Sequence, residues 1–250
     1  MKKVLKIFFC LTIFVLYCFT QNLSYAQGPH KPYIVHDTIP VIQHGPYITA
    51  PSKTGVTITW TTDIPAHSKV VYGTGGKLDE ICELQIDGFL PVDTLHTIHL
   101  EDLQPGQHYH YRVVSTGVEK LKPYWPEKTR SVKSPVCSFT TLDEQNSSVN
   151  FDFIADSQHE DVKRLNDNLE LVEWDAIDFL VHGGDALGEV LDEQQIFDKF
   201  IDPVSRRLDH SIPMVYVRGN HEMRGPYARK FKEYVPNPTG RFYYAFNAGP

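Results

Sequence analysis

The sequence predicts a multidomain fold in which an antiparallel β-sandwich at 44–142 is followed by an α/β domain at 148–250. In the first range, short runs that alternate apolar and polar residues are separated by Pro and Gly, and no helical period appears. This pattern is typical of a small sandwich. In the second range, apolar strands alternate with helical patterns in a βαβαβ order, which is typical of a covered sheet.

The strands expected in the sandwich are 56–61, 68–72, 94–100, 108–114 and 136–141. Since successive side chains of a strand point to opposite faces, we expect Tyr109 and Tyr111 to point inward. Trp60 is expected to be the core aromatic residue. A tight turn at 103–107 directly precedes Tyr109.

The strands expected in the α/β domain are 149–155, 176–182 and 212–217, and the helices are 162–172 and 191–208. In both helical ranges Leu, Ile and Phe recur at helical spacing, which predicts one apolar face on each helix.

The first 26 residues have the pattern of a secretory signal peptide. Lys2, Lys3 and Lys6 precede an apolar run at 7–19. The stretch ends with Ser24 and Ala26, which are small residues at positions −3 and −1 of a cleavage site. A membrane anchor is the alternative, but the run is shorter than the ~20 residues that a spanning helix needs. A lipid-modified Cys18 is also conceivable, although the bulky Tyr17 before it makes a poor attachment site.

We therefore expect cleavage after Ala26, a linker at 27–43, and a secreted or periplasmic protein without a transmembrane segment. Cleavage removes three of the 24 basic residues and none of the 31 acidic ones, so the net charge changes from −7 to −10. An acidic surface disfavours nucleic-acid binding, which depends on Lys and Arg. Cys82 and Cys137 remain after cleavage, and an exported location permits a disulfide between them without requiring it.

Potential metal ligands follow each predicted strand of the α/β domain. Asp156, Gln158 and His159 follow the first strand, Asp185 follows the second, and 219–222 (Gly-Asn-His-Glu) follows the third. Ligands bind at the carboxyl ends of the strands in such sheets, so three separate loops can meet at one point. Carboxylate and imidazole groups suit Zn, Fe and Mn, and the sequence thus predicts a paired metal site.

These residues resemble the metallophosphoesterases, the calcineurin-like and purple acid phosphatase group. Asp156, Gly184-Asp185 and the block at 219–222 match the first three motifs of that group in order. The resemblance implies that Asp156 binds the first metal, that Asp185 bridges both, that Asn220 binds the second, and that His221 acts near the leaving oxygen. It also implies two divalent or trivalent ions, with Fe, Zn or Mn as candidates.

The sandwich carries resemblances of its own. The turn and Tyr109 resemble the tyrosine corner of fibronectin type III domains, in which the phenol ties the strand back to the turn. The segment 44–47, followed by 56–62, is similar to the N-terminal domain of purple acid phosphatases.

The sequence departs from the family pattern at three places. Gln158 occupies the usual His position, and a bulge that presents His159 is the alternative that we favour less. Gly188 stands where purple acid phosphatases carry an iron-binding Tyr. The family's later motifs, a lone His and Gly-His-x-His, are absent after His221. We therefore expect a truncated catalytic domain, and we expect residues 1–250 alone to be inactive.

For the whole protein, the resemblance implies an exported enzyme that hydrolyses phosphate esters, phosphomonoesters foremost, by attack of a metal-bound hydroxide. A phosphodiesterase of the same family would show the same residues. A non-catalytic secreted binding module is the alternative from another class. The oligomeric state is not predicted.

Overall fold

The computed structural model describes residues 34–122, 126–146, 148–159, 161–241 and 243–249. The predicted signal peptide and the first part of the predicted linker lie outside these residues. Among the described helices, none has both the length and the apolar character required to cross a membrane.

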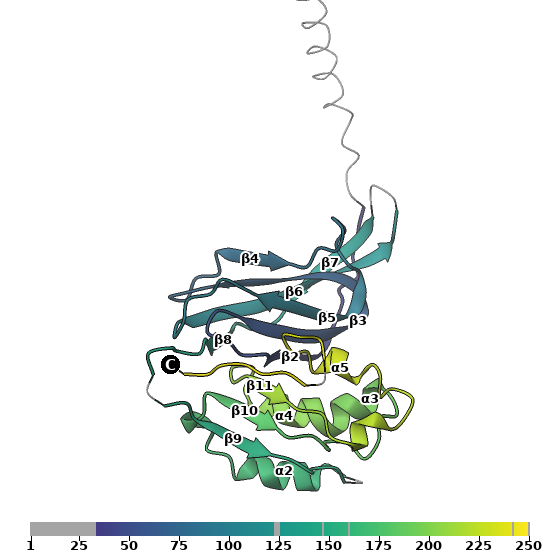
Figure 1. The fold of residues 1–250 in the computed structure, drawn as a ribbon. Helices are drawn as coiled ribbons and strands as arrows, with labels where there is room; N and C mark the ends of the chain where they lie inside the picture. The colour runs from purple at the N-terminus through teal and green to yellow at the C-terminus, as the bar shows by residue number, and fades with distance from the viewer. Residues whose placement is uncertain (1–33, 123–125, 147, 160, 242, 250) are drawn as a thin grey trace, which may run out of the picture. The chain divides into compact units, whose positions relative to one another are not determined.

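The first domain is built from strands β1 (Val35–His36), β2 (Ile42–Thr49), β3 (Val56–Gly73), β4 (Glu80–Glu83), β5 (Asp93–Leu100), β6 (His108–Lys120), β7 (Glu127–Lys133) and β8 (Cys137–Thr140) (Figure 1). The first half of β3 pairs with β2 and β5, and its second half pairs with β4 and β6. Strand β6 also pairs with β7 and β8, and β1 pairs with β7. Apart from the parallel β1–β7 pair these pairings are antiparallel, and the long strand β3 joins the strands on either side of it.

The long strand β3 corrects the prediction of separate strands at 56–61 and 68–72. The register with β5 shifts between Thr61 and Ala66, and the pairing with β6 begins at Ala66. The strands β1, β2, β4 and β7 were not predicted, and β1 and the start of β2 fall within the range expected to be a linker.

The first domain has a buried core of its own, in which the predicted aromatic residues lie. Trp60 is fully buried, and its indole N–H donates to Ser115 Oγ at 2.9 Å. Tyr109 and Tyr111 are buried as predicted. The Tyr109 hydroxyl accepts the backbone N–H of Gln104 at 3.0 Å, which is the contact that the predicted tyrosine corner requires.

Both remaining cysteines are free thiols in this structure. Cys82 and Cys137 are partly buried against the sandwich core. Burial, the largest cause, raises the pKa of each thiol above its usual value.

The second domain is built from β9 (Phe151–Ile154), α2 (Lys163–Glu170), β10 (Phe179–His182), α3 (Glu193–Ile196), α4 (Asp202–Arg207), β11 (Met214–Tyr216) and α5 (Phe231–Tyr234). Short 3-10 turns lie at Trp174–Ala176 and His221–Met223, and a π-helical turn at Phe197–Ile201 joins α3 to α4. The strands are parallel with β10 in the centre, and β11 also pairs with β2 at Met214 and Thr49. The predicted βαβαβ order is confirmed.

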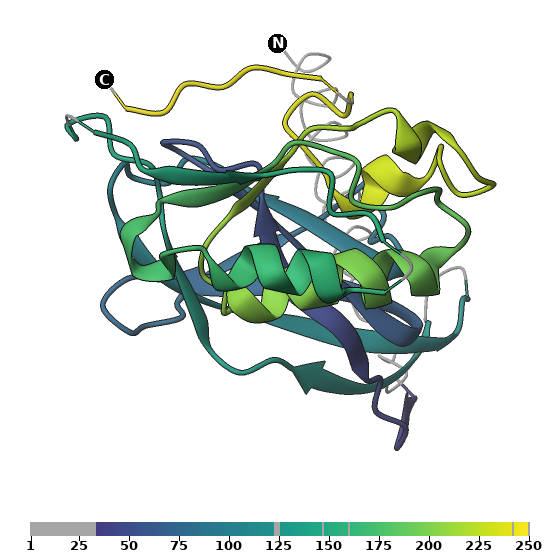
Figure 2. The same ribbon diagram turned by 90° about the horizontal axis from the view of Figure 1, so that it is seen from below.

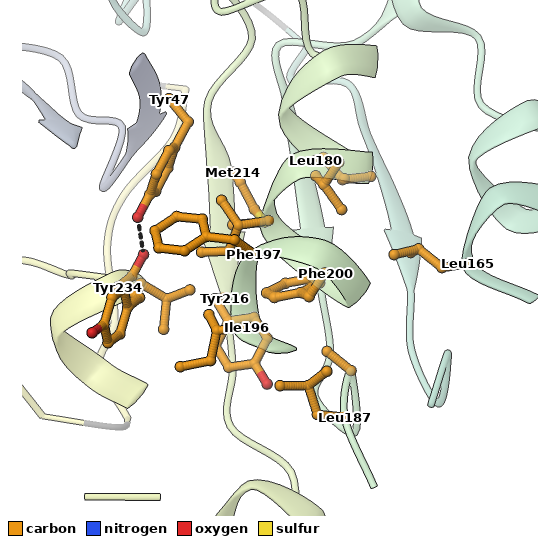
Figure 3. Packing of buried hydrophobic residues seen from close by; sticks show 14 of the residues in the cluster. Tyr47, Leu165, Leu180, Leu187, Ile196, Phe197, Phe200, Met214, Tyr216 and Tyr234 are labelled. Atoms are coloured by element: carbon orange, nitrogen blue, oxygen red, sulfur yellow. Dashed lines mark hydrogen bonds between the residues drawn. The ribbon is translucent and has the colours of Figure 1, made fainter. Parts of the chain in front are cut away.

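One face of this sheet carries the helices (Figure 2). Leu165 from α2 and Phe200 from the π-helical turn are buried in one cluster with Leu180 and Tyr216 of the strands (Figure 3). On the other face, Phe179 and Val215 are covered by the chain near residues 244–248. The helices thereby hold β9, β10 and β11 in a fixed register, so that their carboxyl ends lie together.

Candidate metal centre

The loop that follows β9 lies against the loop that follows β10. The backbone N–H of Asp156 donates to Gly184 O at 3.1 Å, and that of Gln158 donates to Asp185 O at 3.0 Å. These two bonds continue the pairing of the strands into the loops. The structure therefore brings Asp156, Gln158 and Asp185 together, as the sequence predicted.

The loop that follows β11 joins the same junction. The backbone N–H of His221 donates to Asp185 Oδ1 at 2.9 Å. A Cβ on Gly184 would lie 2.3 Å from the backbone N of Gly219, and one on Gly219 would lie 2.0 Å from Asp185 Oδ1. Only glycine allows this close approach of the two loops.

Two candidate ligands have an unusual backbone conformation. Asp156 and Asp185 have φ angles of 53° and 52°, in the left-handed region. Asp tolerates this region better than most residues, but the conformation still costs about 1–2 kcal/mol per residue. Such conformations concentrate at functional sites, where the surrounding structure maintains them.

The Asn220 amide faces the Asp185 carboxylate. With its nitrogen toward Asp185, the amide donates to Oδ2 at 3.2 Å and its oxygen accepts from Arg224 Nη2 at 3.2 Å. With the amide turned over, two oxygens would face each other at that distance, which is favourable only around a shared cation. The Asn220 amide and the Asp185 carboxylate thus lie next to each other, within reach of one ion if the amide turns its oxygen toward Asp185.

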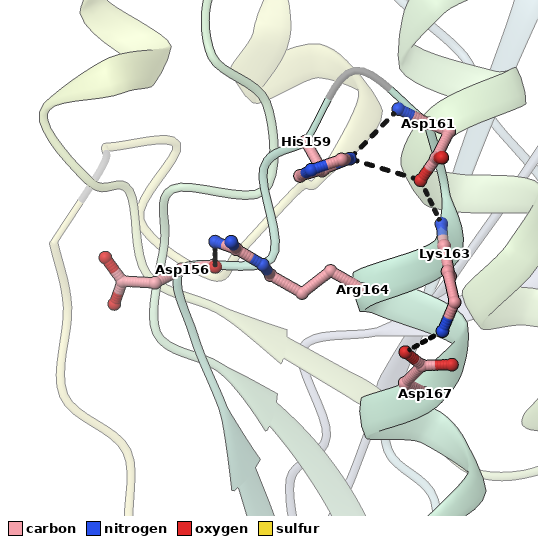
Figure 4. A network of polar contacts seen from close by, with 6 residues as sticks. All are labelled: Asp156, His159, Asp161, Lys163, Arg164 and Asp167. Carbon is pink, nitrogen blue, oxygen red and sulfur yellow. Dashed lines mark hydrogen bonds and ion pairs between the residues drawn. The ribbon is translucent and has the colours of Figure 1, made fainter.

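Gln158 supplies a further oxygen ligand. Its Oε1 atom is buried and has no hydrogen-bond partner among the described residues. A buried, unpaired carbonyl oxygen is unfavourable by about 1–3 kcal/mol, and a cation would satisfy it. His159 is instead exposed, with Nδ1 3.2 Å from Asp161 Oδ1, and it lies on the opposite side from the Asp156 carboxylate (Figure 4).

A hydrogen bond holds the imidazole ring of His221 in place. Its Nδ1 lies 2.8 Å from Gly188 O, an acceptor, and 3.3 Å from Arg224 Nη1, a donor; the shorter contact to Gly188 O assigns the hydrogen to Nδ1. The other ring nitrogen, Nε2, is therefore the one available to a ligand.

Glu222 is a site residue that the sequence analysis did not single out. Its buried carboxylate accepts four backbone N–H groups, from Asp185 (3.1 Å), Ala186 (2.7 Å), Leu187 (3.2 Å) and Gly219 (2.9 Å). It ties the loop after β10 to the loop after β11. Its place in the Gly-Asn-His-Glu block was the available signal, but the block does not show where the side chain points.

His182 makes the equivalent link to the loop after β9. Its Nδ1 accepts the backbone N–H of Gly184 at 3.2 Å, so Nε2 carries the hydrogen and donates to Ser157 Oγ at 3.0 Å. Burial lowers the pKa of His182 to about 3, which keeps the ring neutral.

The junction as described offers two carboxylates, Asp156 and Asp185, and two amides, Gln158 and Asn220. No three His, Cys, Asp or Glu side chains of the described chain lie close enough to hold a metal. The ligand set present is therefore rich in oxygen and only partial for two ions.

The second domain thus places candidate oxygen ligands on three strand-end loops, which is an arrangement that can build a metal centre in an α/β fold. Residues 44–141 match the family described as Purple acid Phosphatase, N-terminal domain, and residues 149–249 match the Calcineurin-like phosphoesterases. The chain thus combines a purple acid phosphatase N-terminal domain with a calcineurin-like phosphoesterase domain, and members of that phosphoesterase family use a binuclear metal centre.

The chain is also similar to individual proteins. The chain is 27% identical to the Acid phosphatase type 7 of Mus musculus over 98% of its own length and 52% of that protein. It resembles the solved structure of a purple acid phosphatase, PPD1, from yellow lupin (Lupinus luteus), with a TM-score of 0.54 and 18% identity over 74% of this chain and 36% of that one. A structure of PhoD has a TM-score of 0.46 and 14% identity over 71% and 38% of the two chains. The chain spans about half the length of the curated relative that it matches.

Proposed function

We propose that the whole protein is an exported, metal-dependent phosphoester hydrolase. The observation that carries the proposal is the junction of the three loops, where Asp156, Asp185 and Asn220 meet beside the unpaired oxygen of Gln158. The chemistry of this donor set fits hard or borderline cations.

In this proposal Asp156 and Gln158 hold one ion, Asn220 holds the other, and Asp185 lies between them as the bridging ligand. The pair of ions would supply positive charge for the phosphate and an activated water as the nucleophile. The remaining ligands would come from the part of the family fold that residues 1–250 do not span. Fe, Zn and Mn remain the candidate metals.

His221 is the proposed proton donor to the leaving oxygen. The bond from Nδ1–H to Gly188 O orients the ring, and the protonated imidazole would give a second hydrogen, the one on Nε2, to the leaving oxygen. Gly188 provides no phenolate, so we expect no iron–tyrosinate colour.

The test is hydrolysis of p-nitrophenyl phosphate by the whole protein, before and after chelation and metal readdition. Asp185→Asn is expected to lower kcat/KM by about 10²–10³-fold, since removal of one key electrostatic group costs that much in other hydrolases. The matched control, Asp167→Asn, removes an exposed carboxylate of α2 and is expected to leave the rate unchanged. A rate that is indifferent to chelation would refute metal dependence, and no hydrolysis with any of the metals would favour the non-catalytic binding module.

Two comparisons refine the assignment. Gln158→Ala is expected to weaken metal binding and His159→Ala is not; the reverse would make His159 the ligand. A bis(p-nitrophenyl) phosphate assay measures the diesterase alternative, and we propose the monoester as the better substrate on the strength of the acid phosphatase relative.

We further propose that the sandwich is fibronectin type III-like, which the Tyr109 corner supports, and that residues 1–26 are a cleaved signal peptide. N-terminal sequencing of the exported protein is expected to begin at Gln27. A start at Met1 in the membrane fraction would contradict cleavage.

A further inference from the structure

A pocket of about 440 Å³ lies on the outer face of the sandwich, remote in sequence from the loop junction. Its basic residues are His67 and Lys69 of β3, Arg112 of β6 and Lys133 of β7, and no acidic residue lines it. Val71 and Val114 are among its apolar residues. The sandwich therefore presents a basic pocket in a chain whose net charge is −7.

The strand register places these side chains together. Lys69 is paired with Val114, and Val114 is paired in turn with Lys133, so the two lysines flank one valine on the same face. Arg112 is two residues before Val114 on β6 and therefore shares that face. Like charges at such spacing repel each other and destabilise a sheet.

The described residues compensate this charge only in part. Glu83 of β4 lies 3.8 Å from Lys69 Nζ. Neither Arg112 nor Lys133 forms an ion pair with a described residue. Arg112 Nε and His67 Nε2 are buried without a hydrogen-bond partner in the same part of the structure. Arg112 Nε is a donor, and a buried donor without an acceptor is unfavourable; an anion in the pocket would supply the acceptor.

The environment of His67 gives an independent reporter. Burial, and then the charge of Lys128, lowers the pKa of His67, with Lys69 acting in the same direction and Glu83 against it. An anion bound nearby would raise that pKa again, because it favours the charged imidazolium.

We propose that this pocket binds a phosphate- or sulfate-type oxyanion, carried on a small organic group. Arg112 is the principal ligand, with its planar fork of N–H donors matched to oxyanion geometry. Lys69 and Lys133 neutralise the remaining charge, and Val71 and Val114 contact the organic part. The site is separate from the proposed metal centre.

The test is calorimetric titration of the protein, freed of metal by chelation, with phenyl phosphate and with inorganic phosphate. We expect saturable binding that weakens with added NaCl, and at least about a tenfold loss of affinity in Arg112→Gln. Lys133→Gln, an exposed change that spares the fold, is expected to weaken binding in the same direction. Tighter binding of phenyl phosphate identifies an ester as the ligand, and equal binding identifies the free ion.

The matched control Lys232→Gln removes one exposed positive charge on α5 and is expected to leave the affinity unchanged, as is Asp185→Asn. By NMR, the pKa of His67 is expected to rise on saturation. Absence of saturable binding, or an equal loss in Lys232→Gln, would overturn the proposal. Loss of binding in Asp185→Asn but not in Arg112→Gln would instead assign the anion to the metal centre.

Discussion

The Glu222 carboxylate accepts the backbone N–H of Asp185 at 3.1 Å, and so one buried acid fixes the position of the proposed bridging ligand. The same Oε2 atom accepts the N–H of Gly219 at 2.9 Å, in the loop that carries Asn220. Charge-assisted bonds to backbone N–H groups are among the stronger hydrogen bonds in proteins. Glu222 therefore sets the separation of the two loops before any metal binds.

Replacing this acid tests that coupling. In Glu222→Gln, one amide N–H group faces backbone N–H groups that need an acceptor, so we expect a loss of about 2–4 kcal/mol in the free energy of unfolding. Urea denaturation measures it, and Zn²⁺ affinity is expected to fall in parallel. Glu189→Gln replaces an exposed carboxylate and is the control. Equal stability of the two variants would contradict the claim that Glu222 holds the two loops together.

The close approach of Gly184 to Gly219 makes a second prediction. Gly184 has a φ of +94°, and a Cβ there would meet the Gly219 nitrogen at 2.3 Å. We expect Gly184→Ala to destabilise the protein by at least about 2 kcal/mol. At Gly188 an added Cβ has nothing within 4 Å, so Gly188→Ala is the control in the same thermal unfolding assay. A harmless Gly184→Ala would show that the loops are not held this close.

The tyrosine corner gives a prediction in the sandwich. Tyr109→Phe removes the acceptor of the Gln104 N–H and should lower the free energy of unfolding by about 1 kcal/mol. Tyr243 is 74% exposed, and Tyr243→Phe is expected to have no effect. Denaturant midpoints of the two variants compare them directly, and identical midpoints would argue that the corner adds no stability.

The stability of the sandwich should depend on pH through His96. Burial lowers the pKa of His96 to about 4 from the usual 6.5, and its Nε2 lies 2.9 Å from Thr62 Oγ1. Between pH 6.5 and about pH 4, the His96 imidazole is protonated in the unfolded chain but neutral in the folded protein, so the free energy of unfolding falls as the pH falls. This contribution amounts to about 2–3 kcal/mol between pH 7 and pH 4.5.

Urea unfolding at both pH values checks this dependence. His96→Gln is expected to flatten it, whereas His99→Gln, which alters an exposed imidazole, is expected to leave it unchanged. If the free energy of unfolding changes equally with pH in the His96 variant and in the parent, another group is responsible.

The order of the elements and the position of the loops were predictable from the sequence because local periodicity encodes them. The apolar runs before Asp156, Asp185 and 219–222 predicted three strands, and the motifs placed the ligands at their ends. Likewise, the turn before Tyr109 predicted a hydrogen bond that the structure shows.

Long-range features were not predictable in this way. A residue pattern does not show that β3 continues as one strand over Val56–Gly73, or that Met214 pairs with Thr49. The roles of Glu222 and His182 depend on the approach of separate loops, which only the folded chain reveals. Likewise, only the folded structure shows that Gln158 Oε1 is buried without a hydrogen-bond partner among the described residues.

The central claim is that the three strand-end loops build one metal centre, and titration of the chain with Zn²⁺ or Mn²⁺ tests it most directly. We predict saturable binding that is lost in Asp185→Asn and kept in the control Asp167→Asn. Equal affinity in all three proteins, or no saturable binding at all, would contradict the claim.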